Sequence, residues 1–461
     1  MKRAIIQPQW IFLILAAVFG SLLAVAAPPG QAPDEYQHFG RAYMLSEGQL
    51  FPVEAMLPKG ITRMLAFTAN LPFHIEQKIS LKGLWQVGNK PVQPKNRLPK
   101  PLPASSVFSP LPYLASAAGI WLGRVFGLPP LALFSLGRMC NLGVWIVLGF
   151  LTLRTTPIFK WVFFLLLLSP MSLHLAGSYS ADSLTIALSF LWLSICLWLA
   201  LGAGRVTWIG GLLLLLFAFL LPLAKPPYAL LLGAAIIIPT VRYPGLRISG
   251  FPIPSAGMRA AALSAVFILG SALFIASANI NREYYAAMLP IPGIDSMVQI
   301  VYVLRHPFNF LLAVLQTLRQ DGPLIFQGTV GILGWLDTRL PNFVYWLHPL
   351  AILLAALLDS QLQPILRGWQ KLVLGLTGLA TFLMVAAGLY VTWTPVGAPK
   401  VSDIQGRYLI PIVPFLLLGL SNQRLAAQRR LLVVAAPLYA GLVLGITLWA
   451  VMNRYYTIPL L

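Results

Sequence analysis

Long apolar runs separated by short polar segments recur along almost the whole chain, from Trp10 to Met452. A run of about 20 apolar residues is long enough to cross a bilayer as a helix, which satisfies its own backbone hydrogen bonds in lipid. The pattern predicts about eleven membrane-spanning helices of this kind. We expect them at residues 10–27, 131–153, 161–178, 183–201, 206–222, 226–241, 259–278, 343–358, 372–393, 408–421 and 431–452. The sequence therefore predicts an all-α polytopic membrane protein in which residues 1–461 form a single membrane domain.

Two segments between these runs, residues 28–130 and 279–342, are too long to be simple turns. Long loops are uncommon unless they are functional or disordered. Each contains an apolar stretch interrupted by charges, Phe108–Phe126 in the first and Met297–Leu318 in the second, which is typical of a helix lying at the membrane interface. The alternative for Phe108–Phe126 is a further span, which would move every later loop to the other side of the membrane.

Composition excludes a soluble enzyme, because 58% of the residues are hydrophobic and only 10% are charged, against about a quarter in soluble domains. The net charge of +20 would favour nucleic-acid binding in a soluble chain. In a membrane protein, however, Lys and Arg accumulate in cytoplasmic loops. We therefore expect anionic membrane lipid, and no nucleic acid, as a partner.

The charge pattern also predicts the topology. The first run follows Met-Lys-Arg and ends in Ala-Val-Ala-Ala, which imitates a signal peptide, but its length favours a retained anchor. With a cytoplasmic N-terminus, the short basic loops fall inside, as the positive-inside rule requires, and the C-terminus is extracytoplasmic. Asp359 is then the one acidic residue predicted inside. This arrangement, in a plasma (inner) membrane, indicates that the chemistry lies at the outer face.

The sharpest candidate for chemistry is a Pro-rich turn just outside the first run, followed by Asp34, Glu35 and His38. Asp34 occupies the position of a helix N-cap, with Glu35 in the first turn, and this capping role is one interpretation. The other is that a carboxylate fixed at the membrane surface acts as a general base toward a hydroxyl. His38 follows Asp34 by four residues and is expected on the same helix face.

Two further candidates lie at predicted outer ends of spans. Asp182, within Ser178–Ser183, is either a first-turn residue of the next helix or a functional acid, since ionisable groups at membrane depth are costly. Lys225, in Ala-Lys-Pro-Pro-Tyr, either extends to lipid headgroups or binds a phosphate.

The remaining candidates are arginines. Arg407 precedes Tyr408 and follows Gly406, which would allow an anionic group to approach the guanidinium closely; the alternative is an interfacial anchor. Arg138 lies a turn or two inside its span and needs a partner there. Asp34, Glu35 and Asp182 are the candidates for that partner.

Six motifs in order along the chain resemble a bacterial and archaeal membrane family called domain of unknown function 2142. They comprise residues 28–43, 109–113 with 137–138, 180–183, 224–228, 331–337 and 405–411. That family is itself similar to the GT-C glycosyltransferases. The resemblance implies a GT-C-like fold and a polyprenyl-phosphate-linked sugar donor. It also implies an extracytoplasmic glycan, lipid or protein as acceptor.

Carried over to this chain, the resemblance implies that Asp34 and its neighbour Glu35 occupy the catalytic acidic position. Asp182 resembles a second acidic position, and Lys225 and Arg407 resemble phosphate-contacting cations. The order Asp-Glu departs from the usual Asp-Asp or Glu-Asp, so either carboxylate could face the acceptor.

Arg138, His38 and Tyr408 complete the predicted binding site. No cofactor is indicated by a motif, and a divalent cation stays an open alternative. The predicted reaction is transfer of the sugar with inversion. Rival hypotheses are a flippase or transporter of lipid-linked sugars, for which inverted repeats would be expected, and a non-catalytic assembly subunit.

Overall fold

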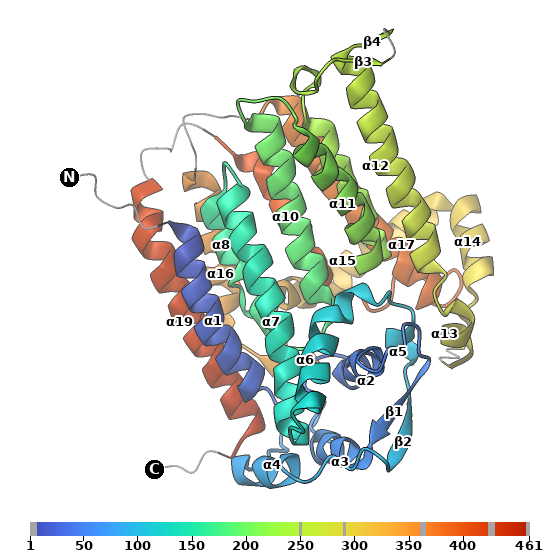
Figure 1. Cartoon of the computed structure of the whole chain (residues 1–461), viewed down its shortest axis with the longest axis vertical. Coiled ribbons are helices and arrows are strands. Elements are labelled where there is room, and N and C mark those ends of the chain that lie inside the picture. Colours follow the sequence, from blue (N-terminus) through green and yellow to red (C-terminus); the bar gives the residue numbers. More distant parts are fainter. Residues whose placement is uncertain (1–6, 249–250, 289–291, 360–365, 423–428, 458–461) are drawn as a thin grey trace.

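The computed structural model describes residues 7–248, 251–288, 292–359, 366–422 and 429–457. Most of these residues are helical. Among the described residues, six helices are long and apolar enough to cross a membrane, or seven if the bent pair at residues 296–305 and 307–330 is one span. The six are α1 (Pro8–Ala26), α7 (Pro130–Thr155), α10 (Ala181–Leu201), α12 (Ser255–Ala278), α17 (Gly368–Thr392) and α19 (Arg429–Tyr455). Helix α10 is at the centre of this bundle, since 83% of its apolar window is buried, against 17–39% for the other five (Figure 1).

The other predicted spans are helical but shorter or broken. Three are single elements, namely α11 (Trp208–Ala224), the 3-10 helix η2 (Pro226–Ile237) and α16 (Asn342–Leu358). Residues 161–178 form α8 (Lys160–Leu167) and α9 (Pro170–Ala176), and residues 408–421 form η4 (Gly406–Leu409), α18 (Val413–Leu417) and η5 (Leu418–Leu420). Proline at the start of α9 and in α18 explains the breaks, because it cannot donate the helical hydrogen bond. The expected number of eleven crossings therefore stays a prediction.

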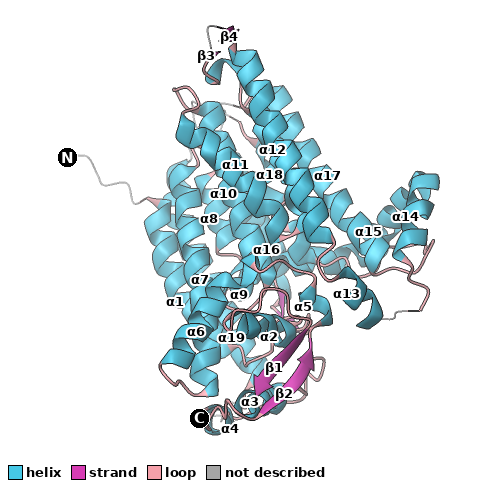
Figure 2. Ribbon diagram, turned by 45° about the vertical axis from the view of Figure 1, so that its right-hand side comes forward, coloured by secondary structure: helices cyan, strands magenta, loops and turns pink. Residues whose placement is uncertain are grey.

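The first long loop is a folded layer over one end of the bundle. It contains α2 (Glu35–Leu45), β1 (Glu54–Pro58), α3 (Lys59–Thr68), α4 (Leu81–Gly88), β2 (Arg97–Pro101), α5 (Pro103–Ser106), η1 (Leu111–Tyr113) and α6 (Leu114–Val125). Strands β1 and β2 pair antiparallel, with Glu54 opposite Pro101 (Figure 2). The layer has its own core, which includes Phe39, Ile61 and Met64.

The described residues are mostly helical, as expected for the predicted all-α class, and also form three short strand pairs. Besides β1–β2, these are β3 (Leu246–Ile248) with β4 (Phe251–Ile253), and β5 (Ile332–Leu333) with β6 (Thr338–Arg339). Each pair is local, and none builds a larger sheet among the described residues.

The length of helix α6 bears on the alternative left open for Phe108–Phe126, which stays a prediction. Its 12 residues span about 18 Å, well short of the roughly 30 Å hydrocarbon core. It packs along α7 through Gly119, where an added Cβ would lie 2.7 Å from the Leu136 carbonyl oxygen. The expectation that this segment does not cross the bilayer agrees with these dimensions.

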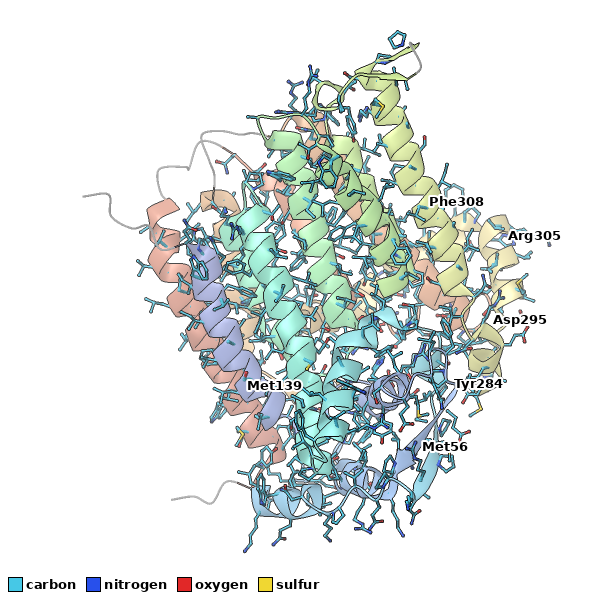
Figure 3. The ribbon with its side chains drawn as sticks, in the orientation of Figure 1. Met56, Met139, Tyr284, Asp295, Arg305 and Phe308 are labelled. Atoms are coloured by element: carbon cyan, nitrogen blue, oxygen red, sulfur yellow. The ribbon has the colours of Figure 1, made fainter. Side chains whose placement is uncertain are left out.

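The second long loop contains α13 (Arg282–Met288), α14 (Ser296–Arg305) and α15 (Pro307–Val330), with a bend of 105° between the last two. Helix α15 packs along the loop that links α17 to η4. Phe310 contacts Tyr390, the Thr317 hydroxyl accepts from the Val401 N–H at 2.8 Å, and Thr329 contacts Gly406. Helix α15 therefore packs against the C-terminal end of α17 and the loop that follows it. Figure 3 shows Arg305 and Phe308 pointing outward from this side.

The end of the last helix lies against the first loop. The Ile79 N–H donates to the Tyr455 carbonyl at 2.9 Å, and the Thr457 N–H donates to the Ile79 carbonyl at 3.1 Å. The start of α1 is at the opposite end of the molecule (Figure 1). The two chain ends thus lie at opposite ends of the helical bundle, and their sidedness in the membrane stays a prediction.

Candidate functional site

Three charged side chains that are far apart in the sequence meet where the bundle joins the first loop. One Asp182 carboxylate oxygen lies 2.7 Å from the Lys225 ammonium, and the other lies 3.0 Å from Nε of Arg407. Asp182 and Arg407 are each only 8% exposed. The acid therefore holds two cations side by side, and three of the predicted site residues are in direct contact.

Local sequence places each member of this trio. The Ser180 hydroxyl accepts the Asp182 N–H, which starts α10 and puts Asp182 in its first turn. Helix α11 ends at Lys225, because two prolines follow it. Arg407 lies in η4, whose peptide at Gly406 packs on the backbone of α15.

Gly406 lies against the backbone of α15. A Cβ there would lie 2.1 Å from the Ile325 carbonyl oxygen and 2.2 Å from the Thr329 nitrogen. The glycine thus lets the α15 backbone approach closely, which accounts for it without an anionic group; approach of an anion to Arg407 stays a prediction.

Tyr408 forms an aromatic wall beside both cations. The Lys225 ammonium lies 4.2 Å from its ring centroid, and the Arg407 guanidinium lies 5.3 Å from it. The Tyr408 carbonyl accepts the Tyr228 hydroxyl at 2.8 Å, which ties η4 to η2. Tyr408 therefore contacts the cations, as predicted for a site residue.

Asp34 lies next to this trio in an unusual backbone conformation. Its φ of 56° is in the left-handed region, which is costly for a residue other than glycine. Its backbone carbonyl accepts the His38 N–H, but its carboxylate makes no capping hydrogen bond and no ion pair within the described residues. The side-chain capping interpretation is therefore wrong.

Electrostatics link Asp34 to the other charges. Partial burial raises the pKa of the Asp34 carboxyl; the Arg407 charge opposes this rise, and Asp403 and Asp182 add to it. Asp34 thus combines an unpaired carboxylate with a raised pKa and feels the charge of one cation of the trio, Arg407. Such a group is suited to accept a proton.

Glu35 faces the opposite way and is fully buried. Its two oxygens accept from Arg138 Nε at 2.9 Å and Nη2 at 2.6 Å, and one also accepts the Tyr179 N–H. Arg138 in turn donates to the carbonyls of Ala24, Ala27 and Pro28 at the end of α1. Of the three acids considered, Glu35 is the partner of Arg138. Its contacts favour a positioning role over the predicted catalytic one.

His38 lies between Asp34 and a residue that sequence reasoning did not assign, Tyr113. The His38 Nδ1 and the Tyr113 hydroxyl are 2.7 Å apart. Burial lowers the pKa of His38 to about 3, so the ring is neutral at physiological pH. The Asp182, Lys225 and Arg407 charges all act on this ring, which puts it beside the trio.

Two other residues near Asp34 were not predicted. Asp403 has a φ of 59° and raises the pKa of Asp34, and Tyr285 of α13 has a pKa raised by burial and by both acids. Tyr113 and Asp403 stand in or beside recognised motifs, which could have indicated them. Tyr285 stands in none.

The motif at residues 331–337 holds the turn that precedes Asp34 through hydrogen bonds and an ion pair. The Trp335 indole N–H donates to the Gly30 carbonyl at 2.8 Å, in the turn that precedes Asp34. Asp337 pairs with Arg454 at 2.8 Å, and Arg454 also donates to the Leu71 carbonyl. The second loop and the last helix thus hold the first loop in place.

No group of three or more His, Cys, Asp or Glu side chains that could hold a metal ion is present in the described part of the chain.

A helical bundle with six membrane-length apolar helices and an ionic site at its end defines a polytopic α-helical membrane protein. The chain belongs to the family described as predicted membrane protein (DUF2142), whose model matches residues 17–416. This confirms the family resemblance found in the sequence. Comparison with curated proteins and with solved structures gave no match.

Proposed function

We propose that the protein is a plasma-membrane glycosyltransferase that moves a sugar from a polyprenyl-phosphate-linked donor to an extracytoplasmic glycan, lipid or protein. The observation that carries the proposal is the unpaired carboxylate of Asp34, which feels the charge of Arg407, while Asp182 holds Arg407 and Lys225 side by side. A transferase of this kind needs a base for the acceptor and cations for the departing phosphate.

The cations are the proposed phosphate site. Nη1 of Arg407 makes no hydrogen bond to the described residues, and Nη2 contacts only the Tyr408 hydroxyl at 3.4 Å. The guanidinium therefore keeps donors for a phosphate oxygen, which Arg recognises well. In this proposal Asp182 holds both cations in place and does not itself react.

In the proposed reaction, the Asp34 carboxylate takes the proton of the acceptor hydroxyl. The hydroxyl oxygen then forms a bond to the anomeric carbon while the bond from that carbon to the phosphate oxygen breaks. The electron pair stays on the lipid phosphate, which Lys225 and Arg407 stabilise. A single displacement of this kind inverts the anomeric configuration.

The proposed sidedness follows from the charge pattern. The N-terminus is cytoplasmic, and the first loop, the ionic site and the C-terminus are extracytoplasmic. The lipid donor then reaches the site from the outer leaflet, while a hydrophilic acceptor arrives from outside.

The test is sugar transfer by the purified protein from a panel of undecaprenyl-phosphate-linked hexoses to envelope acceptors. Asp34→Asn is expected to lower the rate by about two to four orders of magnitude, because it removes a proton acceptor at nearly constant shape. Asp295→Asn is the matched control, since Asp295 is an exposed helix cap and Asn caps almost equally well.

Arg407→Gln is expected to weaken donor binding more than it changes the pH profile. An Asp34→Asn variant as active as the parent would refute the base assignment. If Lys225→Gln and Arg407→Gln also bound the donor normally, the phosphate site would be refuted and an assembly subunit would be the better interpretation.

A further inference from the structure

The outer surface of the first loop carries an excess of unpartnered positive charge. Seven cations there are exposed and make no side-chain hydrogen bond or ion pair within the described residues, namely Lys59, Arg63, Lys78, Lys82, Lys90, Lys95 and Lys100. Exposed acids in the same loop are few: Glu54, and Glu76, which lies 3.2 Å from His74. The exposed surface is therefore strongly basic.

The other cations of the same loop, Arg41, Arg97 and Arg124, are bound within the loop. Unpartnered positive charge is therefore confined to the exposed surface. Glu47 binds Arg97 through two hydrogen bonds of 2.7 and 2.8 Å, and it lies 3.0 Å from Arg124. Arg41 donates to backbone carbonyls. The cations that hold this layer together are thus distinct from those that face solvent.

Aromatic rings lie among the exposed cations. On α4, Trp85 is 66% exposed and follows Lys82 by three residues; on α3, Phe67 is 37% exposed and follows Arg63 by four. These spacings put each ring beside a cation on one helix face. Helices α3 and α4 pack against each other, so the two pairs form one surface. We call this surface, together with the exposed Lys90 just after α4, the α3–α4 face.

The α3–α4 face lies at the end of the bundle where α7 begins and α19 ends. Helix α7 passes the end of α1 near Arg138, which donates to the Ala24 and Ala27 carbonyls, and continues to Pro130. These eight residues extend α7 by about 12 Å. Helices α3 and α4 pack on this extension. Figure 3 shows nitrogen-tipped side chains projecting from the same end of the molecule.

We propose that the α3–α4 face binds an anionic polysaccharide, one that carries uronate or phosphate groups along its chain. Cations spaced over one surface suit a repeating anion, and exposed aromatic rings suit the apolar faces of sugar rings. The proposal uses the extracytoplasmic placement of the first loop from the proposed function, but it does not depend on the transfer reaction.

The test is binding of polygalacturonate by the full-length protein in an uncharged detergent, compared with neutral dextran and with polyglutamate. We expect binding of polygalacturonate that weakens with salt, no binding of dextran, and weaker binding of polyglutamate. The double variant Lys82→Gln/Lys90→Gln is expected to lower the affinity about tenfold or more. Trp85→Ala should lower the affinity for polygalacturonate and leave that for polyglutamate unchanged.

The matched control is Arg154→Gln/Arg205→Gln, which removes two exposed cations from the opposite end of the molecule. An equal loss in this control would overturn the proposal, as would the absence of polygalacturonate binding. Equal binding of polyglutamate, with no effect of Trp85→Ala, would also overturn the proposal, because the surface would then bind any polyanion without selecting a polysaccharide. Preferential binding of phosphatidylglycerol vesicles through Lys82 and Lys90 would instead make it a lipid contact. The variants change exposed side chains only, and failure of sugar transfer would leave these binding results unaffected.

Discussion

The buried ion pair between Glu35 and Arg138 offers the most direct test of how the site is held. Arg138 is 2% exposed and connects three parts of the chain, namely α7, the end of α1 and the first turn of α2. We consider Arg138→Met, which keeps much of the side-chain volume but removes the charge and every N–H donor. Glu35 would then be a buried carboxylate whose remaining hydrogen bond comes from the Tyr179 N–H.

The magnitude follows from these contacts. Removing one partner of a buried ion pair costs about 3–5 kcal/mol, because the other charge stays buried without compensation. The carbonyls of Ala24, Ala27 and Pro28 also lose their donor, so the upper part of this range is expected. Glu35→Gln leaves the Arg138 charge buried, but the Ala24, Ala27 and Pro28 carbonyls still accept from it, so the lower part of the same range, about 3 kcal/mol, is expected. The double variant should be more stable than Arg138→Met alone, since no unpaired charge remains.

The assay is reversible unfolding in mixed micelles with increasing denaturing detergent, for the parent, both single variants and the double variant. The four free energies of unfolding form a double-mutant cycle. Strictly additive effects, or an Arg138→Met variant within about 0.5 kcal/mol of the parent, would refute the reasoning. A further refuting result would be normal stability of Glu35→Gln together with complete loss of sugar transfer, which would return Glu35 to a catalytic role.

Three other outcomes are expected. Because the pKa of Asp34 is raised in the folded state, ionising Asp34 lowers the stability of the protein as the pH rises through that pKa. Asp34→Asn should therefore melt at a higher temperature than the parent at about pH 8. The difference should vanish as the pH falls below the ordinary aspartate range. Gly406→Ala should destabilise the protein by about 1–3 kcal/mol through its clash with α15, while Gly441→Ala, where an added Cβ meets nothing within 4 Å, should be neutral or slightly stabilising in calorimetry. Arg454→Gln should speed hydrogen exchange at residues 71–79 without affecting α7, and unchanged exchange there would contradict the bracing role of its pair with Asp337.

The sequence by itself determined the class of the protein. Apolar runs of bilayer length indicate a membrane protein, because such a segment can cross lipid with all its backbone hydrogen bonds made only as a helix. Charge asymmetry between the loops, the two long loops and the six motifs were equally readable. Asp34, Asp182, Lys225 and Arg407 were found because charged residues near membrane depth are rare and therefore stand out.

Tertiary structure alone decided how those residues pair. Arg138 needed an acid, but three candidates were open, and only the packing of α2 against α7 selected Glu35 over Asp34 and Asp182. Equally, only the fold assigned Asp182 to both Lys225 and Arg407, which left Asp34 free. Partners more than 40 residues apart in the chain carry no local signal, since their contact depends on how helices pack.

Local backbone detail was also beyond the sequence. The β1–β2 pair, the breaks within residues 161–178 and 408–421, and the reason for Gly406 arise from contacts between distant segments. A hydrophobic pattern gives the length and apolar character of a segment, which fixes its environment. It does not give the neighbour against which that segment packs, and in this protein the neighbours determine which carboxylate is left without an ion-pair partner among the described residues.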